Sequence, residues 1–344
     1  MITAIIVLAA LIAAIIFSVF GVALYAFHRI TGKRYNGNKN LKYFTAVDFP
    51  ELAAEPISFV SNRWQTLRGF LYRKETVESP KALVIFAHGF GAGHQAYTTE
   101  INALAEAGYW VLAYDATGCV ASDGARLYGF DQGVLDLRSA IRYANEEPRF
   151  SKMKKILVGH SWGAFCVMNN VEAEGVCGAV AMCGFISGAK VLAQNTVGRK
   201  VPCLTFLAEA FLRLFNSIRF GKAANFNSLK SLQKTDKPVY LIYGSSDKTV
   251  SFRGNGAIFA KKFAESSNIT CKICEGKAHN PYLTMDAERA MNQTFSEIAK
   301  QRKKNPVLAL QMYKEIDYAK IMEEDSEVMR SIAEYCDRLA DKKC

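Results

Sequence analysis

Short apolar runs alternate with helical patterns between residues 82 and 275. Residues 82–87, 155–158 and 239–243 are continuous apolar runs, and residues 269–275 form a further strand-like segment. Runs of this length are typical of strands that are buried on both faces of a sheet. Their alternation with helical segments predicts an α/β fold with a mostly parallel sheet and helices on both faces.

The N-terminal segment has a different pattern, because residues 2–27 contain no charged side chain. At about 1.5 Å per residue, a helix of this length exceeds the roughly 30 Å hydrocarbon thickness of a bilayer. A secretory signal usually has a basic start, a shorter apolar core and a small-residue cleavage site. We therefore predict a transmembrane anchor over residues 1–28, with an uncleaved or atypical signal as the alternative.

The charge distribution suggests an orientation for this anchor. Five basic residues follow the apolar segment within residues 29–54: Arg29, Lys33, Arg34, Lys39 and Lys42. The positive-inside rule then places the rest of the chain on the cytoplasmic side, after a basic juxtamembrane linker. The net charge of +11 fits a membrane-surface protein, and no aromatic–basic motif indicates a nucleic-acid partner.

The nine cysteines give weaker support for a cytoplasmic location. Cys166, Cys177 and Cys183 lie in apolar runs. This placement favours buried free thiols over a disulfide framework.

A G-x-S-x-G pentapeptide at residues 159–163 directly follows the apolar run 155–158 and precedes a helical stretch. A sharp strand-to-helix turn needs small residues on both sides of its central residue. Such a turn exposes the Ser161 hydroxyl at a helix N-terminus, where the helix dipole favours a developing oxyanion. The context predicts that Ser161 is the nucleophile of a serine hydrolase.

Such a nucleophile needs a base and an orienting acid. Of five histidines, only His279 lies downstream of the pentapeptide, in a loop after the segment 269–275. Asp247 lies just past the apolar run 239–243, where open α/β sheets place functional groups. The alternative interpretations are a solvated loop histidine and an aspartate that only forms a turn.

The glycine-rich loop at residues 88–94 follows the apolar run 82–87. Such a loop can present backbone N–H groups, and we expect those of Phe90 and Trp162 to form an oxyanion hole. A phosphate site is the alternative, but the loop lacks the spacing of a P-loop or a dinucleotide motif.

These motifs, in this order, resemble the α/β-hydrolase family over residues 55–300. Within it the chain looks most similar to the monoacylglycerol-lipase and serine-aminopeptidase-like branch. The resemblance implies an opening hairpin at residues 57–72, a parallel strand at 110–115 and a small helical cap at about 186–235. Two departures are the segment 116–122, which lacks the branch's usual motif, and Trp162 in place of a common Met or Gln.

The expected cap carries apolar residues near helical spacing: Leu204, Phe206, Leu207, Phe211, Leu214, Phe215 and Ile218. They predict either an apolar lid for an acyl chain or a helix packed on the core. Residues 301–344 are expected to form a helical extension.

The expected function is a membrane-anchored serine hydrolase that cleaves carboxylic esters, including lipid-like ones, through an acyl-enzyme and without metal or organic cofactor. The alternatives are an aminopeptidase-like enzyme and a non-catalytic membrane-associated scaffold. Since the predicted catalytic residues lie within residues 88–279, residues 1–28 are expected to be dispensable for activity.

Overall fold

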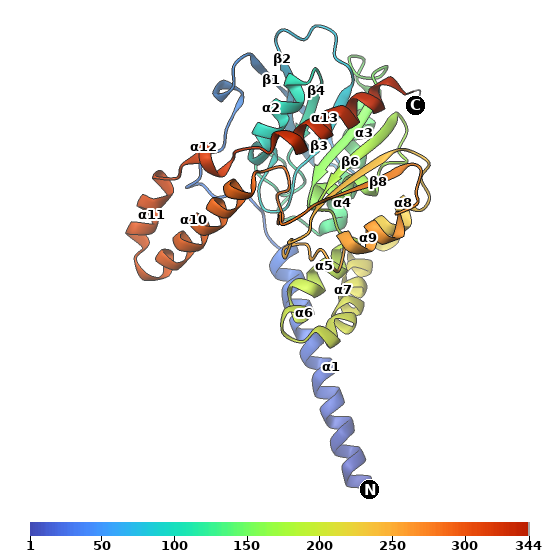
Figure 1. Ribbon diagram of the computed structural model, residues 1–344. Coiled ribbons are helices and arrows are strands. Elements are labelled where there is room, and N and C mark those ends of the chain that lie inside the picture. The colour runs from blue at the N-terminus through green and yellow to red at the C-terminus, as the bar shows by residue number, and fades with distance from the viewer. Residues whose placement is uncertain (343–344) are drawn as a thin grey trace.

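The computed structural model describes residues 1–342 and contains one eight-stranded sheet in the order β1-β2-β4-β3-β5-β6-β7-β8 (Figure 1). The strands are β1 (Leu52–Val60), β2 (Thr66–Lys74), β3 (Leu83–Ala87), β4 (Trp110–Tyr114), β5 (Lys155–His160), β6 (Val176–Met182), β7 (Val239–Gly244) and β8 (Ile269–Cys274). The hairpin β1–β2 is antiparallel and joins β4 antiparallel, while the other neighbours pair in parallel. The predicted fold class is confirmed.

Helices cover both faces of this sheet. One face carries α2 (Thr98–Glu106) and α13 (Ser326–Asp341), and the other carries α3 (Phe130–Glu146), α4 (Trp162–Met168), α8 (Ser228–Leu232) and α9 (Gly256–Lys262). The strand β3 shows why helices are needed on both faces of the sheet. Its Ile85 belongs to one apolar cluster and its Phe86 to the other, because successive side chains on a strand point to opposite faces.

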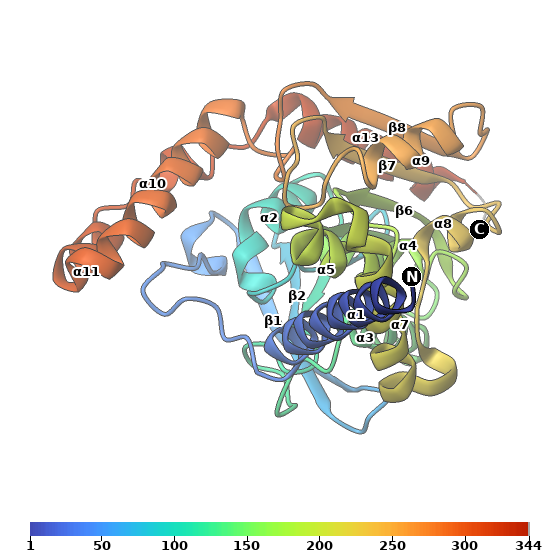
Figure 2. The same ribbon diagram turned by 90° about the horizontal axis from the view of Figure 1, so that it is seen from below.

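The C-terminal extension belongs largely to the body of the molecule. Val328, Ile332 and Leu339 of α13 are buried on the sheet. In contrast, α10 (Met285–Lys304) and α11 (Pro306–Lys314) form a hairpin that projects from the body, with the short α12 (Tyr318–Ile321) leading back (Figures 1 and 2).

The N-terminal helix α1 (Ile2–Thr31) extends away from the domain for about half its length (Figure 1). It is the one helix within residues 1–342 that is long and apolar enough to cross a membrane. Its other half packs on the cap through Val19, Ala23, Ala26 and Phe27, all of which are buried.

The cap consists of helices inserted between β6 and β7, namely α5 (Gly188–Asn195), α6 (Val197–Lys200), α7 (Thr205–Phe220) and α8. Figure 2 shows α1 alongside α5 and α7. The rings of Phe211 and Phe215 lie edge-on to Phe20 of α1, with centroids 5.2 and 5.4 Å apart. Phe206 and Ile218 are 71% and 77% exposed.

The buried face of α7 therefore packs on α1 and on other helices of the cap in place of the central core. The amphipathic pattern identified a helix with a buried face. It gave no information about the partners, which are the N-terminal helix and the cap helices α5 and α6.

The segment after α1 is held against the domain. Arg34 donates hydrogen bonds to the carbonyl oxygens of Val120 and Ser122 at 2.9 and 3.0 Å. Tyr35 forms a parallel bridge with Cys119.

The cysteine prediction needs one correction, since Cys166 and Cys183 are buried free thiols whereas Cys177 is disulfide-bonded. An apolar run cannot distinguish a buried thiol from a buried disulfide sulfur, and Cys177 no longer supports a reducing compartment.

Candidate active site

Ser161 lies at the turn between β5 and α4 with φ 57° and ψ −111°, a conformation that is strained for a residue with a side chain. The turn is possible because its neighbours are glycines. A Cβ atom on Gly163 would lie 1.8 Å from the carbonyl oxygen of Ala87, and one on Gly159 would lie 2.5 Å from the carbonyl carbon of Gly163. Both glycines are therefore required by close backbone approach, as the pentapeptide predicts.

The structure brings Ser161, His279 and Asp247 together in one line of hydrogen bonds. Nε2 of His279 lies 2.9 Å from Oγ of Ser161, and Nδ1 lies 2.7 Å from Oδ2 of Asp247. These distances are within hydrogen-bond reach for a nucleophile, its base and an orienting carboxylate.

Asp247 makes the contacts expected for both of the interpretations that the sequence left open. Its Oδ1 accepts hydrogen bonds from the N–H groups of Thr249 and Val250 at 2.8 and 3.0 Å, which is the turn-forming role. Its Oδ2 faces His279, so the same turn fixes the carboxylate toward the imidazole.

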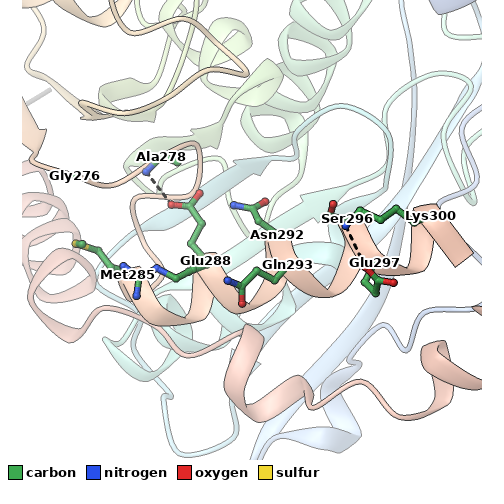
Figure 3. A pocket seen from close by; sticks show the side chains of 10 residues that line it. Gly276, Ala278, Met285, Glu288, Asn292, Gln293, Ser296, Glu297 and Lys300 are labelled. Atoms are coloured by element: carbon green, nitrogen blue, oxygen red, sulfur yellow. Dashed lines mark hydrogen bonds and ion pairs between the residues drawn. The ribbon is translucent and has the colours of Figure 1, made fainter.

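The loop that carries His279 is clamped by Glu288, in the first turn of α10. One carboxylate oxygen accepts a hydrogen bond from the N–H of Ala278 at 2.8 Å, and the other accepts one from the N–H of Asn280 at 2.7 Å. Figure 3 shows Glu288 reaching from α10 toward Ala278 at one end of a groove along that helix. The N–H groups of the residues before and after His279 are thus both bonded to one side chain.

A second clamp comes from Lys277, whose ammonium group is buried. It donates hydrogen bonds to the carbonyl oxygens of Pro281 and Leu283 at 2.8 and 2.7 Å and pairs with Asp325. Sequence reasoning missed Lys277 and Glu288, because single charged residues in a loop and on a helix carry no motif.

The two backbone N–H groups expected to form the oxyanion hole belong to Phe90, in the loop after β3, and Trp162, the first residue of α4. Neither N–H donates a hydrogen bond to any group within residues 1–342. The indole of Trp162 instead donates to the carbonyl oxygen of Phe130 at 2.9 Å, which fixes the start of α4 beside α3. Both N–H groups are thus available to a ligand.

His160 links these parts of the site. Its Nε2 donates to the carbonyl oxygen of His279 at 2.8 Å, and its Nδ1 accepts from the hydroxyl of Tyr97 at 3.0 Å. Tyr97 in turn accepts from the N–H of Gly89 at 3.1 Å. Burial and, to a smaller extent, the nearby His279 lower the pKa of His160 to about 3, so His160 is neutral at physiological pH.

Cys183 lies close enough to His160 and His279 for the three side chains to be considered as a metal site. Donor atoms of His160, Cys183 and His279 lie within 4.8 Å of one another. However, both ring nitrogens of each histidine are already engaged in the hydrogen bonds given above. The cluster is held by internal contacts of the protein.

A mostly apolar cavity of about 160 Å³ adjoins Ser161. Its wall includes Phe130, Phe185, Val191 and Leu192. The last two belong to α5, so the cap contributes to the cavity through α5 and not through the apolar residues of α7 that the sequence indicated.

Comparisons with known proteins bear on the family and the fold. Residues 78–233 match the sequence model of a family described as serine aminopeptidase, S33. The chain is 24% identical over 253 residues to human monoglyceride lipase, covering 64% of this chain and 82% of that protein.

Solved structures with a similar fold include an esterase from Pyrococcus furiosus, with a TM-score of 0.56, 21% identity and coverage of 79% of this chain and 98% of that one. An alpha-beta hydrolase from Vibrio vulnificus has a TM-score of 0.51 and 19% identity, with coverage of 74% and 82%. At these identities the likeness establishes the fold.

Proposed function

Because the chain belongs to the α/β-hydrolase family, we propose that it is a serine hydrolase that cleaves carboxylic esters through an acyl-enzyme. The observation that carries this proposal is the line from Ser161 through His279 to Asp247, with contacts of 2.9 and 2.7 Å. A binding scaffold would have no need for a strained serine aligned with a base.

The proposed reaction uses only side chains and backbone groups of this site. Nε2 of His279 accepts the proton of Ser161 as Oγ attacks the ester carbonyl, and Asp247 stabilises the imidazolium. The N–H groups of Phe90 and Trp162 hold the oxyanion. His279 then protonates the leaving alcohol, and a water molecule, deprotonated by His279, attacks the acyl-enzyme and releases the acid.

The ester is favoured over a peptide by the walls of the cavity. Among the described residues that line it, none carries a charge. A site that captures the free amine of a peptide would need a carboxylate there, since a buried ammonium requires a partner. Peptidase activity is retained as the second candidate because the matching family model is described as serine aminopeptidase.

We further propose that α1 anchors the enzyme in a membrane. Only 6% of its most apolar stretch is buried, so it is not the core helix of a soluble domain. The proposed organisation is an anchor over 1–28, a basic linker over 29–54, a hydrolase domain over 55–300 with its cap at about 186–235, and a helical extension over 301–344, whose last two residues lie outside the described part of the chain. The basic residues after the anchor favour a cytoplasmic domain.

The test of the catalytic proposal is Ser161→Ala in the full-length protein. We expect loss of fluorophosphonate labelling and of 4-nitrophenyl ester hydrolysis, with an unchanged melting temperature. Ser151→Ala is the matched control, because it alters an exposed serine before β5, at the end of that strand opposite to Ser161. Equal labelling of wild type and Ser161→Ala would rule out Ser161 as the nucleophile.

A parallel assay with aminoacyl anilides separates the two candidate activities. A higher kcat/KM for anilides than for esters would favour the peptidase. Protease digestion of the domain from outside sealed cells would overturn the cytoplasmic orientation.

A further inference from the structure

The cavity beside Ser161 has one wall residue from a distant part of the chain. Ile30, in the last turn of α1, lines the same cavity as Ser161, together with Val191 and Leu192 of the cap. The helix that would anchor the protein therefore reaches the catalytic serine. An anchor that served only as a tether would end before the site.

The last turn of α1 is fixed by specific contacts. Arg219 of α7 donates hydrogen bonds to the hydroxyl of Thr31 and, at 2.7 Å, to the carbonyl oxygen of Tyr128. Its guanidinium carbon also lies 4.4 Å from the ring centroid of Phe27. These contacts hold the turn that contains Ile30 against the cap and the body at once.

A further contact ties Ile30 to the predicted oxyanion loop. The hydroxyl of Tyr35 donates to the carbonyl oxygen of Ile30 at 2.8 Å. The ring of Tyr35 packs on that of Phe90, with centroids 4.5 Å apart. Ile30 is thus positioned relative to the same loop that would hold the reacting carbonyl.

Leu192 shows that the contact between helices and the cavity wall are continuous. It is buried in the cluster formed with Val19, Ala23 and Phe27 of α1, and it also lines the cavity. Apolar side chains therefore extend from the middle of α1 to Ser161 without an intervening charged group in this wall.

We infer that the last turn of α1 forms part of the acyl-binding pocket and that Ile30 limits the length of the acyl chain. This inference rests on the proposed ester hydrolysis. The substrates it implies are esters with an aliphatic acyl chain, since the wall offers apolar contacts and no charge. Each additional buried CH₂ group should raise kcat/KM roughly threefold to fourfold until the chain meets Ile30.

The test uses full-length protein in detergent micelles and 4-nitrophenyl esters from acetate to dodecanoate. Ile30→Trp should shift the best substrate to a chain at least two carbons shorter and lower kcat/KM for longer chains about tenfold or more. Ile30→Ala should shift it to a longer chain. The loss in Ile30→Trp should grow with chain length and be smallest for acetate, the shortest acyl group of the series.

Ile15→Trp is the matched control, because Ile15 lies on the same helix but is 47% exposed and outside the cavity. Fluorophosphonates with short and long alkyl groups give a second readout. The long probe should label Ile30→Trp more slowly than wild type, and the difference from wild type should be smaller for the short probe.

The outcomes separate the inference from its premise. A wild type that hydrolyses none of the esters would refute the proposed function. An active wild type whose chain-length profile moves in neither Ile30 variant would refute the role of α1 alone. A shift produced equally by Ile15→Trp would also count against Ile30 as a specific wall residue.

Discussion

The carboxylate of Glu288, which accepts hydrogen bonds on both sides of His279, provides the most direct test of how this histidine is positioned. Glu288→Gln keeps the length and shape of the side chain but leaves one carbonyl acceptor where there were two. The new NH₂ group then faces the N–H of either Ala278 or Asn280, whose bonds to Glu288 are 2.8 and 2.7 Å long. The loop loses one of its two hydrogen bonds to this side chain.

The size of the effect follows from the bonds. A hydrogen bond to a charged group contributes about 1.5–3 kcal/mol. About 1.4 kcal/mol corresponds to a factor of ten, so the productive loop position can lose up to a hundredfold in relative population. A displacement of about 1 Å at a catalytic group costs a similar factor. We therefore expect kcat to fall about tenfold to hundredfold.

KM should change little, because Glu288 does not line the cavity beside Ser161. Steady-state kinetics on 4-nitrophenyl butyrate separate the two parameters, and the melting temperature reports on folding. Glu297→Gln is the control, since Glu297 lies on the same helix and bonds only Lys300 and Gln301. If Glu288→Gln kept kcat within twofold of that control, the clamp would have no role in positioning His279.

Three further predictions follow from other contacts. Asp247→Asn should lower kcat by orders of magnitude with little change in KM, and near-full activity would mean that another group orients His279. Deleting residues 1–28 should lower the melting temperature measurably and reduce activity on long-chain esters, because it removes the buried Val19 and Phe27, each worth about 1.5–3 kcal/mol; unchanged activity on long-chain esters would restore the initial expectation that the segment is dispensable for activity. Glu100→Gln should raise the melting temperature more at pH 8 than at pH 5, since burial and the neighbouring Glu324 raise the pKa of Glu100 from 4.5 to about 8. The free energy of unfolding of the wild type then falls as pH rises from about 4.5 to about 8, because the carboxyl group ionises in the unfolded chain while it stays protonated in the folded state. An equal rise in melting temperature at both pH values would contradict the raised pKa of Glu100.

The parts of the site predicted from the sequence are those with a local signal. Ser161 is identified by the glycines around it, and His279 by the scarcity of histidines downstream of the serine. Asp247 follows a run that is apolar enough to be a buried strand. In each case the residue type and its position next to a strand carry the information.

The contacts that were missed depend on where helices pack. Glu288 is one of many acidic residues on helices, and only the fold shows that the first turn of α10, which carries it, faces the loop of His279. Similarly, the periodicity of residues 204–218 shows that one helix face is buried but not that its partner is α1. Ile30 lacks any local pattern that would separate it from the other apolar residues of the N-terminal segment.

The packing of α1 on α5 and α7 has a mechanical consequence. A membrane-spanning helix tilts when its apolar stretch is longer than the bilayer is thick. If α1 spans a bilayer, such a tilt would also move the cap, because α1 and the cap share one buried interface. The movement would shift the cavity wall beside Ser161. Membrane thickness would then influence substrate specificity, and the same protein would prefer esters of different acyl-chain length in thin and thick membranes.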